Sequence, residues 1–391
     1  MTLDEIIRTF LDQYHRRQHT HAPESSLVPP AGDPVLFTTS GMHPLTPYLL
    51  GRPHPGGRRL ANVQRCLRTT DLDEVGDRTH LTVFDMLGSW SLGDYDIATS
   101  LRWGHELLTE GFGIDPGRLH ATVFGGDDQV GPDGTALRTW TGLGVPVEVN
   151  GAAENWWSNG PTGPCGPDSE IFVWTGDGPP TGTPGTDERW MEVWNHVQMR
   201  YHRHDDGRLT PLPHVSIDTG MGLERLELVL TGGADVFAGE GLRPWVDAIR
   251  ERWPLGGTER RVVADHLRSA VVVLGDGVRP GNTGRGYVLR RLIRRALTLL
   301  WRDDPGRSLA DLPDEVFAAT GRRFRQQPDL PVLRTVLADE ERRFRELLRR
   351  GRPLVDRVRG RGPLTDRDYH WLHDTHGLPR DLVDALLTEG G

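Results

Sequence analysis

The spacing of apolar residues along the first part of the chain predicts a sheet with helices around it. Ile6, Phe10 and Tyr14 recur at four-residue intervals, which predicts an amphipathic helix over residues 1–20. A second helix is expected at 96–110. Short apolar runs between turn-forming residues predict strands at 35–39, 62–68, 82–87, 190–201 and 212–217.

Residues 158–188 are rich in Gly, Pro, Asn and Thr, which predicts a long loop. The expected strands follow one another through hairpin-like loops more than through regular strand–helix–strand units. The pattern therefore favours an α+β fold with a largely antiparallel sheet.

Beyond about residue 245 the pattern becomes helical. Apolar residues repeat at helical spacing between 288 and 300, and four arginines fall on the opposite face: Arg290, Arg291, Arg294 and Arg295. Residues 340–350 predict a second, charged helix. We therefore predict an α+β domain over 1–245 and an all-α domain over 246–391.

The composition excludes several kinds of active site, but it says less about the class of protein. The chain has 391 residues, 36% of them hydrophobic and 26% charged, as in globular proteins, and no apolar run approaches the ~20 residues of a membrane span. The N-terminus lacks the features of a signal peptide, so a cytoplasmic location is expected. All 46 basic residues are arginine, which excludes lysine Schiff bases and a P-loop lysine. With only Cys66 and Cys165, neither a disulfide framework nor a cysteine zinc site is expected.

The most informative stretch is Asp218–Arg225, which lies between a β-like segment and a helix-like run. Its glycines allow a close approach of backbone to a ligand, and Arg225 carries a fork of donors suited to phosphate. Asp218 suits an ammonium group. An amino acid beside a nucleoside triphosphate needs this set. An ordinary strand–turn–helix with surface charges explains the stretch equally well when it is taken alone.

Other candidates also have two interpretations. Arg68 beside Phe84 suits a nucleotide, or is a surface arginine near a core ring. Trp190 and Trp194 could wall a small pocket, although core packing is the usual role of tryptophan. The segment Thr162–Glu170 ends in two acids and is either a plain turn or a support for Mg²⁺ or substrate.

Two features in the second half carry weaker signals. The arginines of the helix at 288–300 follow a turn that places Asn282 at a helix entry, which suits contact with RNA, whereas a solvated basic face is the usual outcome. His370, His373 and His376 have a tempting spacing, but without cysteines a metal site there is not expected.

Many motifs of this chain, in order, resemble alanyl-tRNA synthetase, a class II aminoacyl-tRNA synthetase. The resemblance covers residue 3 to the C-terminus and rests on Phe37–Met42, Val63–Arg68, Phe84–Gly88, Gly163–Pro167, Glu192–Asn195, Asp218–Arg225, Val263–Arg268 and Arg285–Arg291. It implies an antiparallel class II catalytic sheet flanked by helices over 1–245, followed by a helical domain over 246–391 that recognises the tRNA acceptor stem.

The resemblance also implies roles for single residues. Arg68 would hold the ATP α-phosphate and the alanine carboxylate, and Arg225 the γ-phosphate. Phe84 would stack on adenine, with Met86 and Gly222 completing the ATP site. Alanine would be held by Asp218, which binds the ammonium, together with Gly220, Trp194 and Asn195. With Mg²⁺, Arg68, Asp218 and Arg225 would carry catalysis.

On the tRNA side, Asn282 and Asp381 would read a G·U pair of the acceptor stem. The remaining expected contacts with tRNA are Arg285, Arg290, Arg291 and Arg294.

The chain departs from the family pattern in several places. The loop Thr69–Val75 is short and lacks a lysine, and Gln198, Pro161 and Asp168 differ from the usual residues. The sequence stops at Gly391, so we expect a truncated form without the editing and C-terminal domains. Since one methylene or hydroxyl gives only ~1–3 kcal/mol of discrimination, a separate editing protein or a non-ribosomal product is then expected.

Three hypotheses follow. The first is an alanine–tRNA ligase without cis editing. The second is a stand-alone paralogue that activates a small amino acid for a non-ribosomal or tRNA-dependent biosynthetic acceptor. The third is a non-catalytic RNA-binding relative, against which the retained Arg68, Asp218 and Arg225 count.

Overall fold

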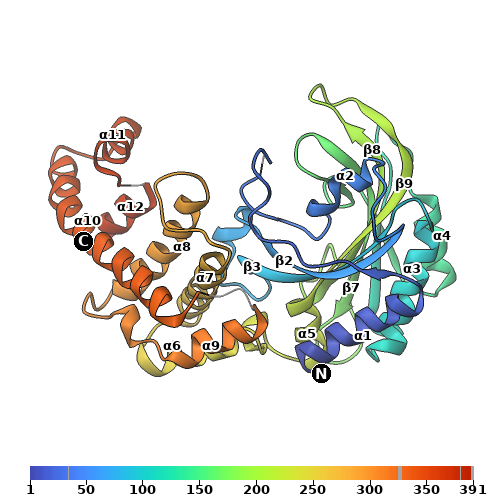
Figure 1. Cartoon of the computed structure of the whole chain (residues 1–391), viewed down its shortest axis with the longest axis horizontal. Helices are drawn as coiled ribbons and strands as arrows, with labels where there is room; N and C mark the ends of the chain where they lie inside the picture. The colour runs from blue at the N-terminus through green and yellow to red at the C-terminus, as the bar shows by residue number, and fades with distance from the viewer. Residues whose placement is uncertain (34, 325–327, 379, 389–391) are drawn as a thin grey trace. The chain divides into compact units, whose positions relative to one another are not determined.

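The computed structural model describes residues 1–33, 35–324, 328–378 and 380–388, without the side chains of residues 71, 381, 385 and 388 (Figure 1). The chain divides into two compact units. Unit 1 comprises Met1–Arg68 and Val83–Glu240, and unit 2 comprises Thr69–Thr82 and Gly241–Gly391. Within the described part of the chain, no helix is both long and apolar enough to cross a membrane.

Unit 1 is built on one mixed sheet, to which nine strands contribute among the described residues. The strand order is β1-β2-β3-β9-β8-β7-β4-β5, with β6 paired to β7. The outer pairs β1·β2 and β4·β5 are parallel and all others antiparallel. The strands are β1 Thr20–His21, β2 Arg59–Leu67, β3 Val83–Ser91, β4 Leu119–Phe124, β5 Val147–Asn150, β6 Trp156–Ser158, β7 Gly163–Trp174, β8 Trp190–Arg203 and β9 Leu209–Gly222.

One face of this sheet is covered by α1 Leu3–Arg16, α3 Ile97–Glu106, α4 Gly134–Gly142 and α5 Leu223–Thr231 (Figure 1). Side chains that alternate along β8 show which residues face the helices. Trp194 lies 6.1 Å from Phe10 of α1 between ring centroids, and His196 Nδ1 lies 2.9 Å from Ser100 Oγ of α3. The neighbouring Asn195 therefore points to the opposite face, where Leu49 of the short helix α2, Thr46–Leu49, belongs to the same buried cluster as Val197 and Met199 of β8.

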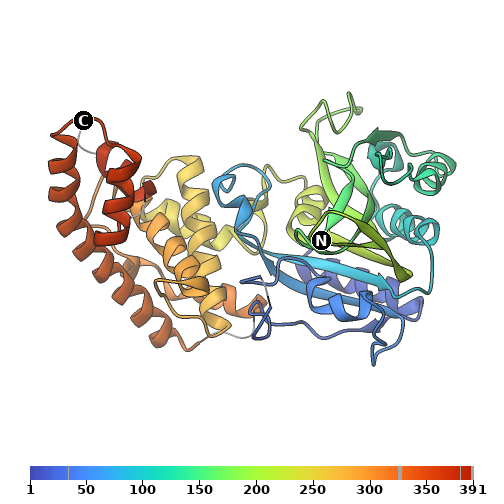
Figure 2. The same ribbon diagram turned by 90° about the horizontal axis from the view of Figure 1, so that it is seen from above.

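Unit 2 is helical. Its helices are α6 Arg243–Arg252, α7 Gly257–Gly275, α8 Gly284–Trp301, α9 Asp314–Arg323, α10 Leu330–Arg359, α11 Asp366–His376 and α12 Arg380–Thr388. Helix α8 packs against both α7 and α10 (Figure 2). Its apolar residues between Val288 and Leu300 form the buried stripe that the sequence predicts.

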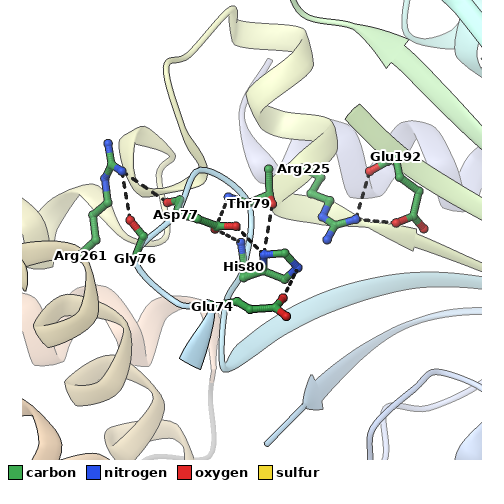
Figure 3. Close-up of polar contacts among 8 residues, drawn as sticks. All are labelled: Glu74, Gly76, Asp77, Thr79, His80, Glu192, Arg225 and Arg261. Atoms are coloured by element: carbon green, nitrogen blue, oxygen red, sulfur yellow. Dashed lines mark hydrogen bonds and ion pairs between the residues drawn. The ribbon is translucent and has the colours of Figure 1, made fainter. Parts of the chain in front are cut away.

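The segment Thr69–Thr82, which we call the strap, leaves β2 and packs with unit 2 before β3 begins. Thr82 donates its backbone N–H to Oδ1 of the buried Asp265 at 2.9 Å. Arg261 donates to the Gly76 carbonyl at 3.1 Å, and His80 lies between the carboxylates of Asp77 and Glu74 at 2.6 and 3.1 Å (Figure 3). The sequence predicted a loop here, Thr69–Val75, but not its association with the helical unit.

Most of the predicted elements are confirmed: α1, β2, β3, α3, β8, β9, α5 and α8. The strand predicted at 35–39 is wrong, because this stretch has no regular structure. Phe37 and Thr38 are buried, and Thr38 bonds through its backbone to Leu27 and Leu67. Burial accounts for the apolar run without a strand ladder.

The long loop predicted at 158–188 is also wrong in its first half, which contains β7. The glycines that suggested a loop serve close packing between strands instead. A Cβ atom on Gly166 would lie 1.9 Å from the Gln198 carbonyl oxygen of β8, so only glycine fits this irregular pairing. Likewise Asp218–Gly222 is the end of β9 and not a turn, and α5 begins directly at Leu223.

Candidate active site

The candidate residues of β3, β8 and β9 lie on the face of the sheet opposite the helices, which we call the open face. Gly220 pairs with Gly88 on one side and with Asn195 on the other, and Asp218 pairs with Trp90. Because directly opposed residues in a sheet share a face, these side chains all point away from the helices. The motif of β3 thus meets those of β8 and β9 on one surface, although it lies more than 100 residues before them.

Asp218 is a buried acid on this surface, only 5% exposed. Burial raises the pKa of its carboxyl to about 7. A carboxylate in such a position gains most from a positively charged partner that enters the site with it. An ammonium group is a partner of this kind.

Gly220 leaves little space beside Asp218. Its N–H donates to Asn195 Oδ1 at 3.1 Å, which fixes the Asn195 side chain. A Cβ atom on Gly220 would lie 2.8 Å from Met86 Sδ and 3.2 Å from Asn195 Oδ1. Met86 Sδ also accepts the Gly41 N–H at 3.2 Å. These contacts form a tight wall that suits a ligand with a small side chain, and they place Met86 beside Gly220.

Arg68 and Phe84 form the pair that the sequence suggested. The Arg68 guanidinium carbon lies 5.2 Å from the Phe84 ring centroid, and Nε donates to the Thr39 carbonyl at 3.3 Å. Both side chains are half-buried, so each keeps a surface for a ligand. A guanidinium beside an aromatic ring can bind an anion and a base together.

Arg225 lies in the first turn of α5, just after the cap residue Gly222. Its Nη1 donates to Glu192 Oε2 at 2.7 Å and to the Glu192 carbonyl at 3.3 Å (Figure 3). The Arg225 side chain is 26% exposed. The pair is therefore accessible, and its ion pair can be exchanged for contact with an anionic ligand.

Two further acids, Glu170 and Asp168, lie on the same face of β7. Burial, together with the neighbouring charge of Glu192, raises the pKa of Glu170 to about 9. Burial raises the pKa of Asp168 to about 7, although Asn155 Nδ2 donates to its Oδ1 at 3.0 Å. The sequence named both acids but assigned them to a loop.

The tryptophans are arranged differently from what the sequence suggested. Trp194 is fully buried on the helix-covered face, so its predicted contact with the amino acid gains no support from this geometry. A register shift between β7 and β8 interrupts the alternation that was expected to place Trp190 and Trp194 together, and Trp190 packs on Trp174. The half-buried Trp157 of β6 packs instead against the apolar cluster that contains Trp90. Sequence reasoning missed Trp157, because only the pairing of β6 with β7 places it there.

In unit 2, the arginines of α8 line a cavity of about 300 Å³. They do not form the plain basic face that the sequence suggested. Arg290 and Arg294 both bind the buried Glu340 of α10, and Arg295 binds Asp73 of the strap at 2.8 Å. Arg291 lines the same cavity. Arg285 lies in the first turn of α8. The side chain of Asp381 lies outside the described residues.

Comparison with known proteins decides the family. The family described as "tRNA synthetases class II (A)" matches residues 5–391. Over 425 residues the chain is 40% identical to an alanine–tRNA ligase of Treponema pallidum, covering 99% of this chain and 68% of that protein. It is 41% identical over 418 residues to the alanine–tRNA ligase of Rubrobacter xylanophilus, covering 99% of this chain and 47% of that one. The chain belongs to the class II (A) tRNA synthetases.

Among solved structures, an apo histidyl-tRNA synthetase of Staphylococcus aureus is 12% identical with a TM-score of 0.38, covering 59% of this chain and 65% of that one. The class II fold expected from the sequence, an antiparallel-dominated sheet flanked by helices and followed by a helical region, is confirmed. The chain spans about two thirds of the length of the Treponema pallidum ligase and about half of the length of the Rubrobacter xylanophilus ligase.

The departures from the synthetase pattern have local explanations. Gln198 lies on the helix-covered face, where its Nε2 donates to the buried Asp133 that caps α4. A polar residue in that core position is therefore satisfied and lies away from the candidate site. Asp168 is satisfied by Asn155.

The acids of this face could hold Mg²⁺ only as a pair. Among the described residues, no group of three or more His, Cys, Asp or Glu side chains is arranged to hold a metal ion. Glu170 and Glu192 nevertheless provide two carboxylates close enough for the charge of Glu192 to raise the pKa of Glu170. Mg²⁺ is usually bound by one or two carboxylates together with substrate phosphates, so this pair fits that arrangement.

Proposed function

We propose that this chain activates alanine with ATP and transfers it to the 3′ end of tRNA. The observation that carries the proposal is the pairing of a buried carboxylate, Asp218, with the closed wall at Gly220. An ammonium would be held by the first, and a side chain larger than a methyl group would meet the second. The family and the names of the relatives support the same reaction.

In the first step, an alanine carboxylate oxygen attacks the α-phosphorus of ATP and pyrophosphate leaves. Arg68 would hold the alanine carboxylate and the α-phosphate together, while Phe84 stacks on the adenine. Arg225 would exchange Glu192 for the γ-phosphate. Glu170 and Glu192 would hold Mg²⁺, which when bound would supply positive charge for the phosphates.

In the second step, a hydroxyl of the terminal ribose attacks the carbonyl carbon of alanyl-adenylate and AMP leaves. Neither step needs a covalent nucleophile from the protein. Positioning and charge stabilisation carry both steps, so arginine suffices where lysine is missing.

We further propose that residues 1–245 carry this chemistry and that 246–391 bind the tRNA acceptor stem. Asn282, Arg285, Arg290, Arg291 and Arg294 are the proposed contacts, with Asp381 added from the resemblance. A G·U pair in the stem is the expected recognition element. A cytoplasmic location stays a prediction from the sequence.

The test measures pyrophosphate exchange with alanine, glycine and serine, followed by charging of tRNA with and without the G·U pair. We expect exchange with alanine and charging that depends on the pair, and Asp218→Ala should abolish exchange. Exchange without charging of any tRNA would favour the paralogue that serves another acceptor. If no amino acid supports exchange, both the alanine–tRNA ligase and the paralogue would be excluded.

A further inference from the structure

The arginines of α8 are organised by one buried carboxylate. Glu340 of α10 is only 1% exposed. Its Oε1 accepts from Arg290 Nε at 2.9 Å, from Arg294 Nε at 2.8 Å and from Arg294 Nη2 at 2.7 Å. Three charge-assisted contacts on one oxygen hold both guanidinium groups in fixed orientations.

The orientation of Arg290 determines that of Asn282. Arg290 Nη1 donates to Asn282 Oδ1 in the turn before α8. Arginine has only donors, so the amide oxygen must face it and the amide NH₂ must face the other way. Asn282 is exposed, so this NH₂ is presented to a ligand as a pair of donors.

We propose that Glu340 is a positioning residue for RNA recognition, acting through Arg290 on Asn282. The relay Glu340–Arg290–Asn282 presents the Asn282 NH₂ to acceptor atoms of a base edge or ribose hydroxyl in the shallow minor groove of the acceptor stem. This inference rests on the proposed function of unit 2, because it presupposes that Asn282 contacts the stem.

A simpler role for Glu340 would be to join α10 to α8. The two roles differ in what a substitution changes. If Glu340 only joins the helices, its loss lowers stability and affects all tRNAs equally. If Glu340 orients Asn282, its loss also removes the preference among stems, because a free Arg290 no longer fixes the amide.

The test compares Glu340→Gln with Glu341→Gln in the full chain. Glu341 is a matched control: it is 7% exposed, neighbours Glu340 and accepts from Arg345 Nη2 at 2.9 Å. Its other side-chain bonds in the described part of the chain go to Ser308 and Leu309, not to Arg290 or Asn282. For each variant we would measure kcat/KM for a tRNA with the G·U pair and for the same tRNA with G·C. Pyrophosphate exchange, which needs no tRNA, serves as the reference for folded enzyme, and thermal unfolding reports stability.

In the wild type we expect G·U to be preferred, and Glu340→Gln to reduce that preference by about tenfold or more, the scale of one lost base-edge contact. Glu341→Gln should keep the preference even where it lowers Tm. In an Asn282→Ala background, Glu340→Gln should change the preference no further.

An unchanged preference in Glu340→Gln would overturn the relay while leaving the proposed function intact. A further loss of preference in the Asn282→Ala background would also overturn the relay, because Glu340 would then act by another route. A wild type that charges G·U and G·C tRNAs equally would overturn both the relay and the proposed reading of the stem.

Discussion

The buried acid Asp218 makes alanine binding dependent on pH. Its carboxyl is 5% exposed, and burial raises its pKa to about 7 from an ordinary value near 3.8. Only the ionised form attracts the alanine ammonium. With a pKa of about 7, the ionised fraction rises from about a tenth at pH 6 to about nine tenths at pH 8. Since apparent affinity scales with the competent fraction, KM for alanine should fall about tenfold between these pH values.

The assay is pyrophosphate exchange at saturating ATP, with KM for alanine measured at pH steps between 6 and 8. Asp218→Asn keeps the shape of the side chain but cannot ionise, so its KM should be raised and should lose this pH dependence. Asp168→Asn is the matched control, because burial also raises the pKa of Asp168 to about 7 while Asn155 already binds it. This variant should keep the dependence of the wild type.

Two results would refute this reasoning. A KM for alanine that stays constant in the wild type from pH 6 to 8 would show that Asp218 is already ionised or does not meet the ammonium. An equal loss of the dependence in Asp168→Asn would assign the titration to the acid cluster as a whole and not to Asp218.

Three further predictions use the same face of the sheet. Because the pKa of Asp218 is raised on folding, its contribution to stability is full below about pH 4 and is lost as pH rises through about 7. In urea unfolding, Asp218→Asn should therefore be more stable than the wild type at pH 8, by a few kcal/mol in order of magnitude. At pH 4 the variant should be no more stable than the wild type. Gly220→Ala should raise KM for alanine at least about tenfold, because its methyl group meets Met86 Sδ and Asn195 Oδ1, while circular dichroism should show an intact fold. Arg225→Gln should raise KM for ATP more than KM for alanine in exchange assays, and equal changes in both would place Arg225 away from the phosphates.

The sequence predicted most of the sheet because its strands carry alternating or continuous apolar runs with turn residues between them. The failures share one physical origin. At 35–39, burial without strand pairing imitates a strand, and at Gly163–Pro167 glycines that allow close strand contact imitate a loop. Periodicity records which side chains are buried, but it does not record which backbone lies next to which.

The candidate site was also predictable only in part. Asp218, Gly220, Arg68 and Phe84 have types that suggest their chemistry, and the structure places Asp218 near Gly220 and Arg68 near Phe84. Trp157 and the orientation of Trp194 were not predictable, since both depend on strand register. In the same way, α8 could not reveal that Glu340, some 50 residues later, binds two of its arginines.

The acids on the open face are alike in how burial affects their charge. Asp168, Glu170 and Asp218 each have a raised pKa, so the sheet holds them partly protonated when no cation is near. Residues that only stabilised the fold would be better replaced by apolar ones, because a buried carboxyl is costly without a partner. The substrates of the proposed reaction supply such partners: the alanine ammonium for Asp218, and the cation that accompanies ATP for Glu170. Binding would therefore ionise groups that folding had left neutral, and the attraction gained at the buried carboxyl of Asp218 would be screened less by water and salt than at an exposed one. The same burial that weakens the empty protein at neutral pH thus strengthens its hold on the two substrates together.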